Sequence, residues 1–219
     1  MAEQAVIDAR QTARGEQGIL NLGCVPSVML DGKLPGDLRR LHAQWPAISL
    51  SMMTGNVQTL YAAVQHNQLD VAIIRAPLPA LPDDLQSRPF TSEKTVLALY
   101  TQHPLSTSSA LTLSSVKDDK WISLHDPEGV GLEQFFYDAC NSAGFQPQVI
   151  QHVTDVLAVI SLVSAGFGIA LLPASAKAVR VENVIYVDII DKLAESELTL
   201  VCHRIIRSEV LNKFLRSLK

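Results

Sequence analysis

The sequence predicts an α/β protein built from two halves, each of which alternates strands and helices. Three observations support this fold class. Residues 18–74 follow a strand-helix-strand-helix-strand order, residues 121–187 repeat the same alternation, and residues 155–173 contain a helix, a glycine stop and a buried strand in sequence. Crossovers of this kind give parallel strands with right-handed connections.

The segment 155–173 is the clearest unit. Four aliphatic residues recur at offsets 0, 3, 4 and 7 from Val156, which is the spacing of one helix face. Thr154 or Asp155 could cap the start of this helix, and Gly166 ends it because glycine accepts the left-handed cap conformation. The apolar run 169–172 is typical of a strand buried on both faces of a parallel sheet.

In the first half, strands are expected at 18–25, 48–52 and 69–74. The helix between the first two strands ends at Trp45, which precedes a proline and therefore disfavours helix. The second helix follows a Thr-Gly-Asn turn. Three prolines between positions 77 and 82 rule out regular structure there.

The second half repeats this logic and contains no low-complexity linker, so the halves are expected to connect through strands. Polar loops with glycines separate its elements. Strands are expected at 95–100, 121–124, 148–153, 184–187 and 198–202, and helices at 132–143 and 210–218.

Composition indicates a globular protein, with 47% hydrophobic and 18% charged residues among 219. The formal charge of −4 and the pI near 5.8 come without a basic patch, so the chain is not expected to contact DNA by itself. Small anionic ligands remain possible, since one arginine or a helix N-terminus is enough to bind them.

Several features favour a cytoplasmic protein. The first 17 residues hold no apolar segment of signal-peptide length, and no later run is long enough to span a membrane. Three cysteines without paired spacing favour free thiols in a reducing compartment.

Five motifs, in this order and spacing, make the chain resemble a known family over nearly its whole length. They are GILNLG at 18–23, Trp45-Pro46, LDVAI at 69–73, His103-Pro104-Leu105 and, most specifically, VSAGFGIALLPA at 163–174. The chain resembles the effector-binding domain of LysR-type transcriptional regulators, and it looks closest to the branch that senses aromatic-catabolism intermediates such as muconate or benzoate.

This resemblance implies a periplasmic-binding-protein-like fold, in which two Rossmann-like subdomains are joined by crossing strands and the effector lies in the cleft between them. Subdomain I is expected at 18–91 and 197–219, and subdomain II at 92–196. Residues 1–17 resemble the end of the linker helix. DNA binding would then belong to an N-terminal winged helix-turn-helix that is missing here, and the protein would be a homo-oligomer, either a dimer or a tetramer.

In open α/β sheets, ligands bind beyond the carboxyl ends of the strands, where the N–H groups of helix N-termini point outward. This rule selects the loops that follow the predicted strands. The candidate effector-binding residues are Pro26, Ser27, Thr54, Gly55, Asn56, Arg75, His125, Asp126, Thr154 and Asp155.

Each candidate has an alternative role. By the resemblance, Ser27 matches a position whose hydroxyl contacts the effector carboxylate, and Thr54 matches the partner loop displaced by one place. Helix capping is the alternative for Ser27, Thr54 and Asn56. Arg75 could pair with a carboxylate ligand or bridge the hinge to an acidic side chain.

In the second half, His125 could donate to an anion or cover the rim of the cleft, and Asp126 would repel a carboxylate unless it is paired. Glu133, near a helix start, is interpreted as a partner of the helix dipole. A redox-sensor role for Cys140 is unsupported, because no second cysteine lies near it in the sequence. A cysteine on a helix is more commonly buried in the core.

No enzyme, cofactor or metal site is indicated. The six histidines are scattered without a short-range pair, Ser27 lacks a Gly-x-Ser-x-Gly elbow, and the glycines at 166 and 168 follow a helix rather than opening one. The predicted function is therefore effector sensing in a transcriptional regulator, for a small anionic or aromatic acid. A transport solute-binding protein of the same two-lobed fold is the alternative, and an enzyme of that fold comes third.

Overall fold

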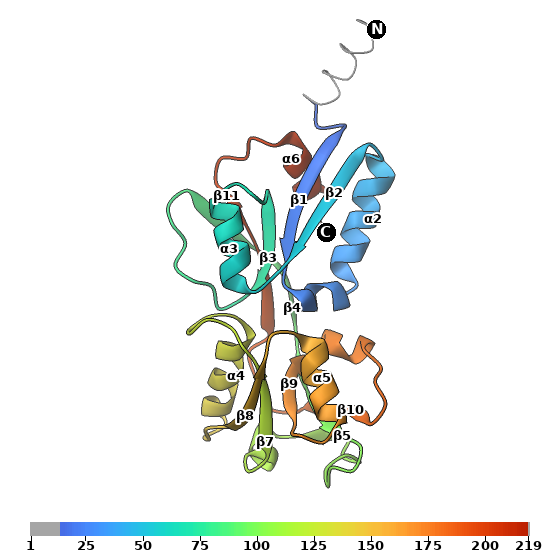
Figure 1. The fold of residues 1–219 in the computed structure, drawn as a ribbon, viewed down its shortest axis with the longest axis vertical. Helices are drawn as coiled ribbons and strands as arrows, with labels where there is room; N and C mark the ends of the chain where they lie inside the picture. The colour runs from blue at the N-terminus through green and yellow to red at the C-terminus, as the bar shows by residue number, and fades with distance from the viewer. Residues whose placement is uncertain (1–13, 219) are drawn as a thin grey trace, which may run out of the picture. The chain divides into compact units, whose positions relative to one another are not determined.

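The computed structural model of the protein describes residues 14–218 (Figure 1). The predicted end of a linker helix, in Ala2 to Arg14, lies almost entirely outside the described residues. The chain divides into two units, which it enters and leaves more than once. The first unit comprises the chain up to Ile74, Ala80–Arg88 and the chain from Leu200 onward, and the second comprises Arg75–Pro79 and Pro89–Thr199.

The first unit is built on a sheet with the strand order β2-β1-β3-β11-β4. Strands β1 (Gly18–Cys24), β2 (Ile48–Thr54) and β3 (Val71–Arg75) run parallel, as the sequence predicts. Strands β11 (Ser196–His203) and β4 (Leu85–Glu93) complete the sheet and cross between the units.

Three α-helices accompany this sheet, α2 (Lys33–Gln44), α3 (Val57–Gln65) and α6 (Glu209–Ser217), and a short 3-10 helix, η1 (Pro26–Leu30), follows β1. Helix α2 packs against α6, and α6 contacts β1. Every residue of β3 is buried, which explains its continuous apolar run.

Strand β4 corrects one expectation, because no strand was predicted between the prolines and residue 95. Pro89 lies within β4 and is exposed, as are Ser87, Arg88 and Ser92 of the same strand. An edge strand tolerates proline because the missing N–H can face away from the ladder, and β4 is at the edge of the strand order. Composition alone therefore concealed this strand.

The second unit contains two strand sets. One has the order β6-β10-β5-β9, formed by β5 (Thr95–Tyr100), β6 (Ala110–Leu111), β9 (Ala170–Pro173) and β10 (Val184–Ile189). The other pairs β7 (Lys120–Leu124) in parallel with β8 (Gln148–Val153). A single parallel bridge between Trp121 and Ile169 links the two sets.

The 155–173 segment is only partly as expected. Helix α5 (Val156–Ser164) and strand β9 follow one another, and all four residues of β9 are buried. The expectation of a purely parallel neighbourhood is wrong, because β9 runs antiparallel to β5. Only Ile169, just before β9, has the parallel pairing, and it pairs with Trp121.

The two glycines of this segment serve the fold. Gly166 has φ +74° and ends α5, and its N–H donates to the Val163 carbonyl at 2.9 Å. At Gly168 a Cβ would lie 2.5 Å from the Lys120 carbonyl oxygen, so a larger residue would separate this segment from β7.

Helices α4 (Gly131–Ser142) and α5 enclose the core of the second unit, with α4 packing on β7 and α5 on β5, β7 and β9. Trp121 is fully buried there, and its ring lies 5.1 Å from that of Phe136. Two further 3-10 turns are η2 (Leu113–Val116) and η3 (Ala174–Ala178). Within residues 14–218 no helix is long and apolar enough to cross a membrane.

Candidate functional site

The predicted site residues of the first half lie at or just after the ends of strands that finish at one edge of a sheet. The last residue of β1, Cys24, lies beside Thr54 of β2 and beside Ile73 of β3 in the parallel register. The N–H of Val25 donates to the Ile73 carbonyl at 3.1 Å, which fixes the exit of β1. The loops after these strands are therefore neighbours, as expected for a parallel sheet.

Ser27 is a buried polar residue at this edge. It lies in η1, directly after exposed Pro26, and is only 6% exposed. Burial of a hydroxyl is favourable only when it has hydrogen-bond partners, so a serine at this place is restricted in orientation.

The loop after β2 has a confirmed capping role. The Asn56 side-chain oxygen accepts a hydrogen bond from the Thr59 N–H at 2.8 Å and caps α3. Thr54 and Asn56 are exposed, and Gly55 is half-buried. Of the two roles considered for Asn56, capping is thus present, and effector contact by this loop stays a prediction.

Arg75 lies in a buried ion pair at the end of β3. Its Nη2 lies 3.0 Å from Oε1 of Glu93, and its Nη1 donates to the Ser196 hydroxyl at 2.7 Å. Glu93 also accepts from the Ser175 N–H at 2.7 Å. The pairing with an acidic side chain considered from the sequence is therefore the arrangement found, and effector contact by Arg75 remains a prediction.

The second unit has an equivalent edge at the ends of β7 and β8. The His125 N–H donates to the Val153 carbonyl at 2.8 Å, so the residues that leave the two strands stay together. Thr154 is exposed, whereas Asp155 caps α5 by accepting from the Ala158 N–H at 2.9 Å. Of the two caps considered for this helix, the structure uses Asp155.

Asp126 forms a reciprocal pair with Glu133 at the start of α4. Its carboxylate accepts from the N–H groups of Leu132 and Glu133 at 2.9 and 3.3 Å, while its own N–H donates to Glu133 Oε2 at 2.8 Å. Asp126 was expected to repel a carboxylate unless it is paired, and its partners here are backbone N–H groups. Burial raises the pKa of the Asp126 carboxyl, while these backbone hydrogen bonds oppose the shift.

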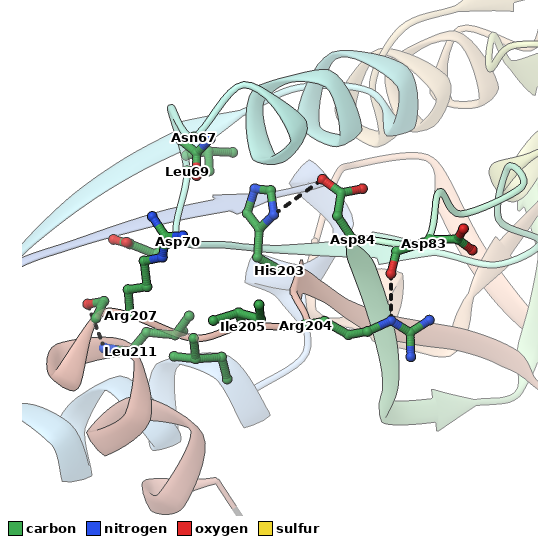
Figure 2. A pocket seen from close by; sticks show the side chains of 12 residues that line it. Asn67, Leu69, Asp70, Asp83, Asp84, His203, Arg204, Ile205, Arg207 and Leu211 are labelled. Atoms are coloured by element: carbon green, nitrogen blue, oxygen red, sulfur yellow. Dashed lines mark hydrogen bonds and ion pairs between the residues drawn. The ribbon is translucent and has the colours of Figure 1, made fainter.

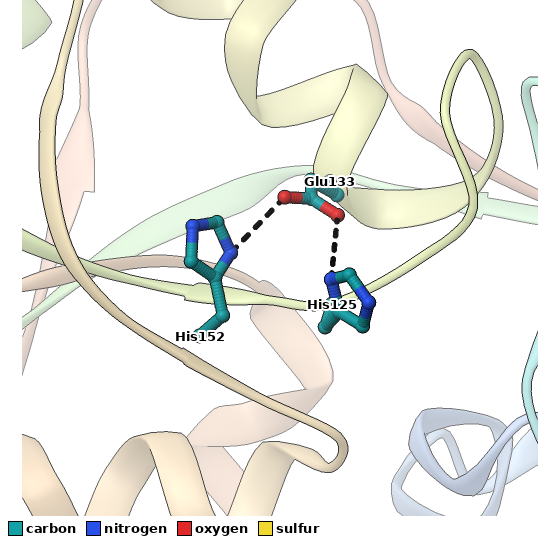
Figure 3. Close-up of side chains that lie close together, drawn as sticks. All are labelled: His125, Glu133 and His152. Carbon is teal, nitrogen blue, oxygen red and sulfur yellow. Dashed lines mark ion pairs between the residues drawn. The ribbon is translucent and has the colours of Figure 1, made fainter.

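Glu133 also lies close to two histidines, which sequence spacing did not reveal. Its Oε1 is 3.1 Å from His152 Nδ1, and its Oε2 is 3.8 Å from His125 Nδ1 (Figure 3). The three residues come from a strand end, a helix start and a neighbouring strand. The pairing of β7 with β8 brings the two histidines together, and the Asp126 N–H holds Glu133 beside them, so no local pattern could have indicated the group.

The first unit also has a pocket of about 500 Å³, which is separate from the predicted site residues at the strand ends (Figure 2). It contains residues that precede β3 and follow β11, including Asp70, whose carboxylate accepts from the Asn21 N–H at 2.8 Å. Since Asp70 precedes β3, this pocket is at the amino end of that strand. None of the predicted effector-binding residues lines it.

Two α/β units joined by crossing strands define the class of periplasmic-binding-protein-like domains with two subdomains. The chain belongs to the LysR substrate binding domain family, whose sequence profile matches residues 13–219. It is an effector-binding domain of the LysR type, as the sequence motifs indicate.

Curated relatives are named transcriptional regulators. The chain is 29% identical over 215 residues to the HTH-type transcriptional regulator BudR of Raoultella terrigena, covering 98% of this chain and 74% of BudR. It is 31% identical over 174 residues to the HTH-type transcriptional regulator AlsR of Bacillus subtilis, covering 80% of this chain and 57% of AlsR. The chain therefore corresponds to only part of these proteins.

Solved structures agree on the fold. CbnR, a LysR family transcriptional regulator, has a TM-score of 0.88 at 17% identity and covers 100% of this chain and 74% of its own. The BenM effector binding domain with its effector benzoate has a TM-score of 0.78 at 19% identity and covers 91% and 90%. Identities this low are informative about architecture alone.

Proposed function

We propose that this domain senses a small carboxylate and thereby controls DNA binding by a LysR-type regulator. The observation that carries the proposal is the strand-end edge of the first unit, where Ser27 is buried just after β1, the strand that runs parallel to β2 and β3. A buried hydroxyl in such a place can donate to an anionic oxygen in a low-dielectric setting, where charge-assisted hydrogen bonds are strong.

The chemistry of relatives supports a carboxylate. The effector of BenM is benzoate, the QuiR effector binding domain is in complex with shikimate, and one relative is the malonate utilization transcriptional regulator of Klebsiella pneumoniae. Each of these three names mentions a carboxylate compound. A member of the branch that senses aromatic-catabolism intermediates would use an aromatic acid or a muconate.

Regulation would act through the affinity difference of the effector for two conformations, about 1.4 kcal/mol per tenfold preference. DNA binding would belong to an N-terminal winged helix-turn-helix and would occur in a homo-oligomer, a dimer or a tetramer. The effector-bound and effector-free states would then differ in how the oligomer presents those DNA-binding parts.

A thermal-shift screen tests the carboxylate proposal. The panel comprises benzoate, cis,cis-muconate, shikimate and malonate, each with sodium chloride at equal ionic strength and, for benzoate, benzamide as the uncharged control. At one hundred times Kd a ligand stabilises the native state by about 2.7 kcal/mol, so the melting temperature should rise with at least one acid and not with its control. If amides and acids shift the melting temperature equally, the carboxylate is not what the site recognises.

The two alternative functions have less support. The curated relatives given above are named transcriptional regulators, which does not favour a transport solute-binding protein. For an enzyme, the test is turnover of the same acids by the purified protein, and turnover at ordinary enzymatic rates would overturn the sensor proposal.

A further inference from the structure

Three potential metal ligands meet at the strand-end edge of the second unit. Figure 3 shows Glu133 between the rings of His125 and His152. One ligand atom from each residue lies within 4.8 Å of the others, and within residues 14–218 no other group of three His, Cys, Asp or Glu side chains has such geometry.

The backbone holds the two histidines on one face. His152 lies opposite Ser123 in the parallel pairing of β8 with β7, and His125 comes two residues after Ser123. Side chains two residues apart along an extended chain point to the same side, so both rings project toward the start of α4. Their centroids are 6.0 Å apart and their planes cross at 79°.

Glu133 is fixed between them by the Asp126 loop. Its Oε2 accepts the Asp126 N–H at 2.8 Å, and the side chain is 15% exposed, whereas the His125 and His152 side chains are 70% and 42% exposed. A partly buried carboxylate with two exposed imidazoles is accessible to an ion from solvent.

We propose that His125, Glu133 and His152 form a binding site for a divalent transition-metal ion such as Zn²⁺. Two imidazole nitrogens and one carboxylate oxygen are a ligand set that zinc accepts, with bonds of about 2.0–2.2 Å and a fourth position left for water. Tetrahedral ligand atoms at such bond lengths lie about 3.3 Å apart.

The observed spacing is close to this requirement. The separation of 3.1 Å between Glu133 Oε1 and His152 Nδ1 already fits. His125 Nδ1 lies 3.8 Å from the other carboxylate oxygen, Oε2, so the exposed His125 ring must move toward Oε1 for all three side chains to bind one ion. The Asp126 carboxylate, held by the N–H groups at the start of α4, adds negative charge beside the site. A cation would therefore offset the repulsion between two neighbouring carboxylates.

Calorimetric titration of chelator-treated protein with ZnCl₂ tests the proposal. The expected result is one ion per chain, with affinity at least about tenfold weaker in H125A and in H152A, because even loss of an outer partner of a metal ligand costs this much. H42A, which removes an exposed histidine in the last turn of α2, is the control and should bind as the wild type does.

E133Q provides a second test, since glutamine retains an oxygen for the Asp126 N–H but lacks the charge, and it should also weaken binding. Melting curves without zinc verify that each variant is folded. Absence of stoichiometric binding in the wild type, or wild-type affinity in the H125A/H152A double variant, would overturn the site. No effector is present in the titration, so the result is independent of the carboxylate proposal.

Discussion

Arg75 and Glu93 form an ion pair that is almost fully removed from water. Nη2 of the arginine lies 3.0 Å from Oε1 of the glutamate, and the side chains are 2% and 12% exposed. Ser175 and Ser196 satisfy further atoms of the pair. The pair joins the end of β3 to the crossing strands β4 and β11.

Replacing Arg75 by alanine should therefore destabilise the protein strongly. The change leaves the Glu93 carboxylate buried without its counter-ion, which costs about 3–5 kcal/mol. Denaturant unfolding measures the loss, and R180A, at an exposed arginine of the same unit, should change the free energy of unfolding by less than about 0.5 kcal/mol. A similar small effect for both variants would show that the pair contributes little.

The turn into α4 should not tolerate a side chain at Gly131. This residue has φ +70°, and a Cβ on it would lie 2.5 Å from Asp126 Oδ2. Gly129 has φ +79° and open space around it, so it is a matched control that measures only the cost of placing a side chain at positive φ. G129A should lose about 1–2 kcal/mol, and G131A should lose more because the Asp126 loop must also move.

Thermal unfolding of the two variants separates strain from steric conflict. Equal losses would mean that the Asp126 carboxylate moves aside at no cost, contrary to the tight cap seen at the start of α4.

Asp126 should make the stability depend on pH in a defined direction. Burial raises the pKa of this carboxyl above 3.8 in the folded protein, so folding favours its protonated form. Its contribution to stability is present below the unfolded pKa and is lost as pH rises through the folded pKa. The relevant pH window lies between the folded pKa and the unfolded pKa of this carboxyl. Relative to D126N, the wild type should therefore gain stability as pH falls through this window.

Unfolding free energies of wild type and D126N across that pH window measure the difference. D118N, at an exposed site, controls for the removal of one negative charge and should give a flatter dependence. A difference between wild type and D126N that falls with decreasing pH would contradict the assigned direction.

The cysteines should be unreactive in the folded protein. All three are free and buried, and burial raises the pKa of the Cys140 thiol to about 12. Since the thiolate is the reactive form, a thiol reagent at pH 8 should label Cys140 only after unfolding in guanidinium. Labelling of Cys140 in native protein at nearly the denatured rate would contradict this and would revive the redox-sensor interpretation.

Sequence patterns were informative where one periodicity dominated. The four aliphatic positions that begin at Val156 are all buried in α5, and the apolar run before Arg75 is the buried strand β3. Strand β4 was missed because Pro89 and exposed polar residues hide an edge strand, whose existence depends on β11 beside it. The antiparallel pairing of β9 was missed because an apolar run does not specify strand direction.

For the site, strand ends could be located from sequence but partners could not. Asn56 and Asp155 carry the signals of helix caps, and both are caps. The Arg75–Glu93 pair and the His125–Glu133–His152 group join residues from different elements. The tertiary arrangement of these elements determines the contacts, and the local spacing of residues in the sequence does not indicate them.

The most direct test of the account is calorimetry with the best carboxylate from the thermal-shift screen, on the wild type, S27A and S51A. Ser51 is an exposed serine of β2 and serves as the matched control. Loss of a hydrogen bond to a charged group costs about 1.5–3 kcal/mol, so S27A, verified as folded by its circular dichroism, should bind at least about tenfold more weakly. S51A should bind as the wild type does, and unchanged affinity in S27A would contradict the placement of the effector at this strand-end edge.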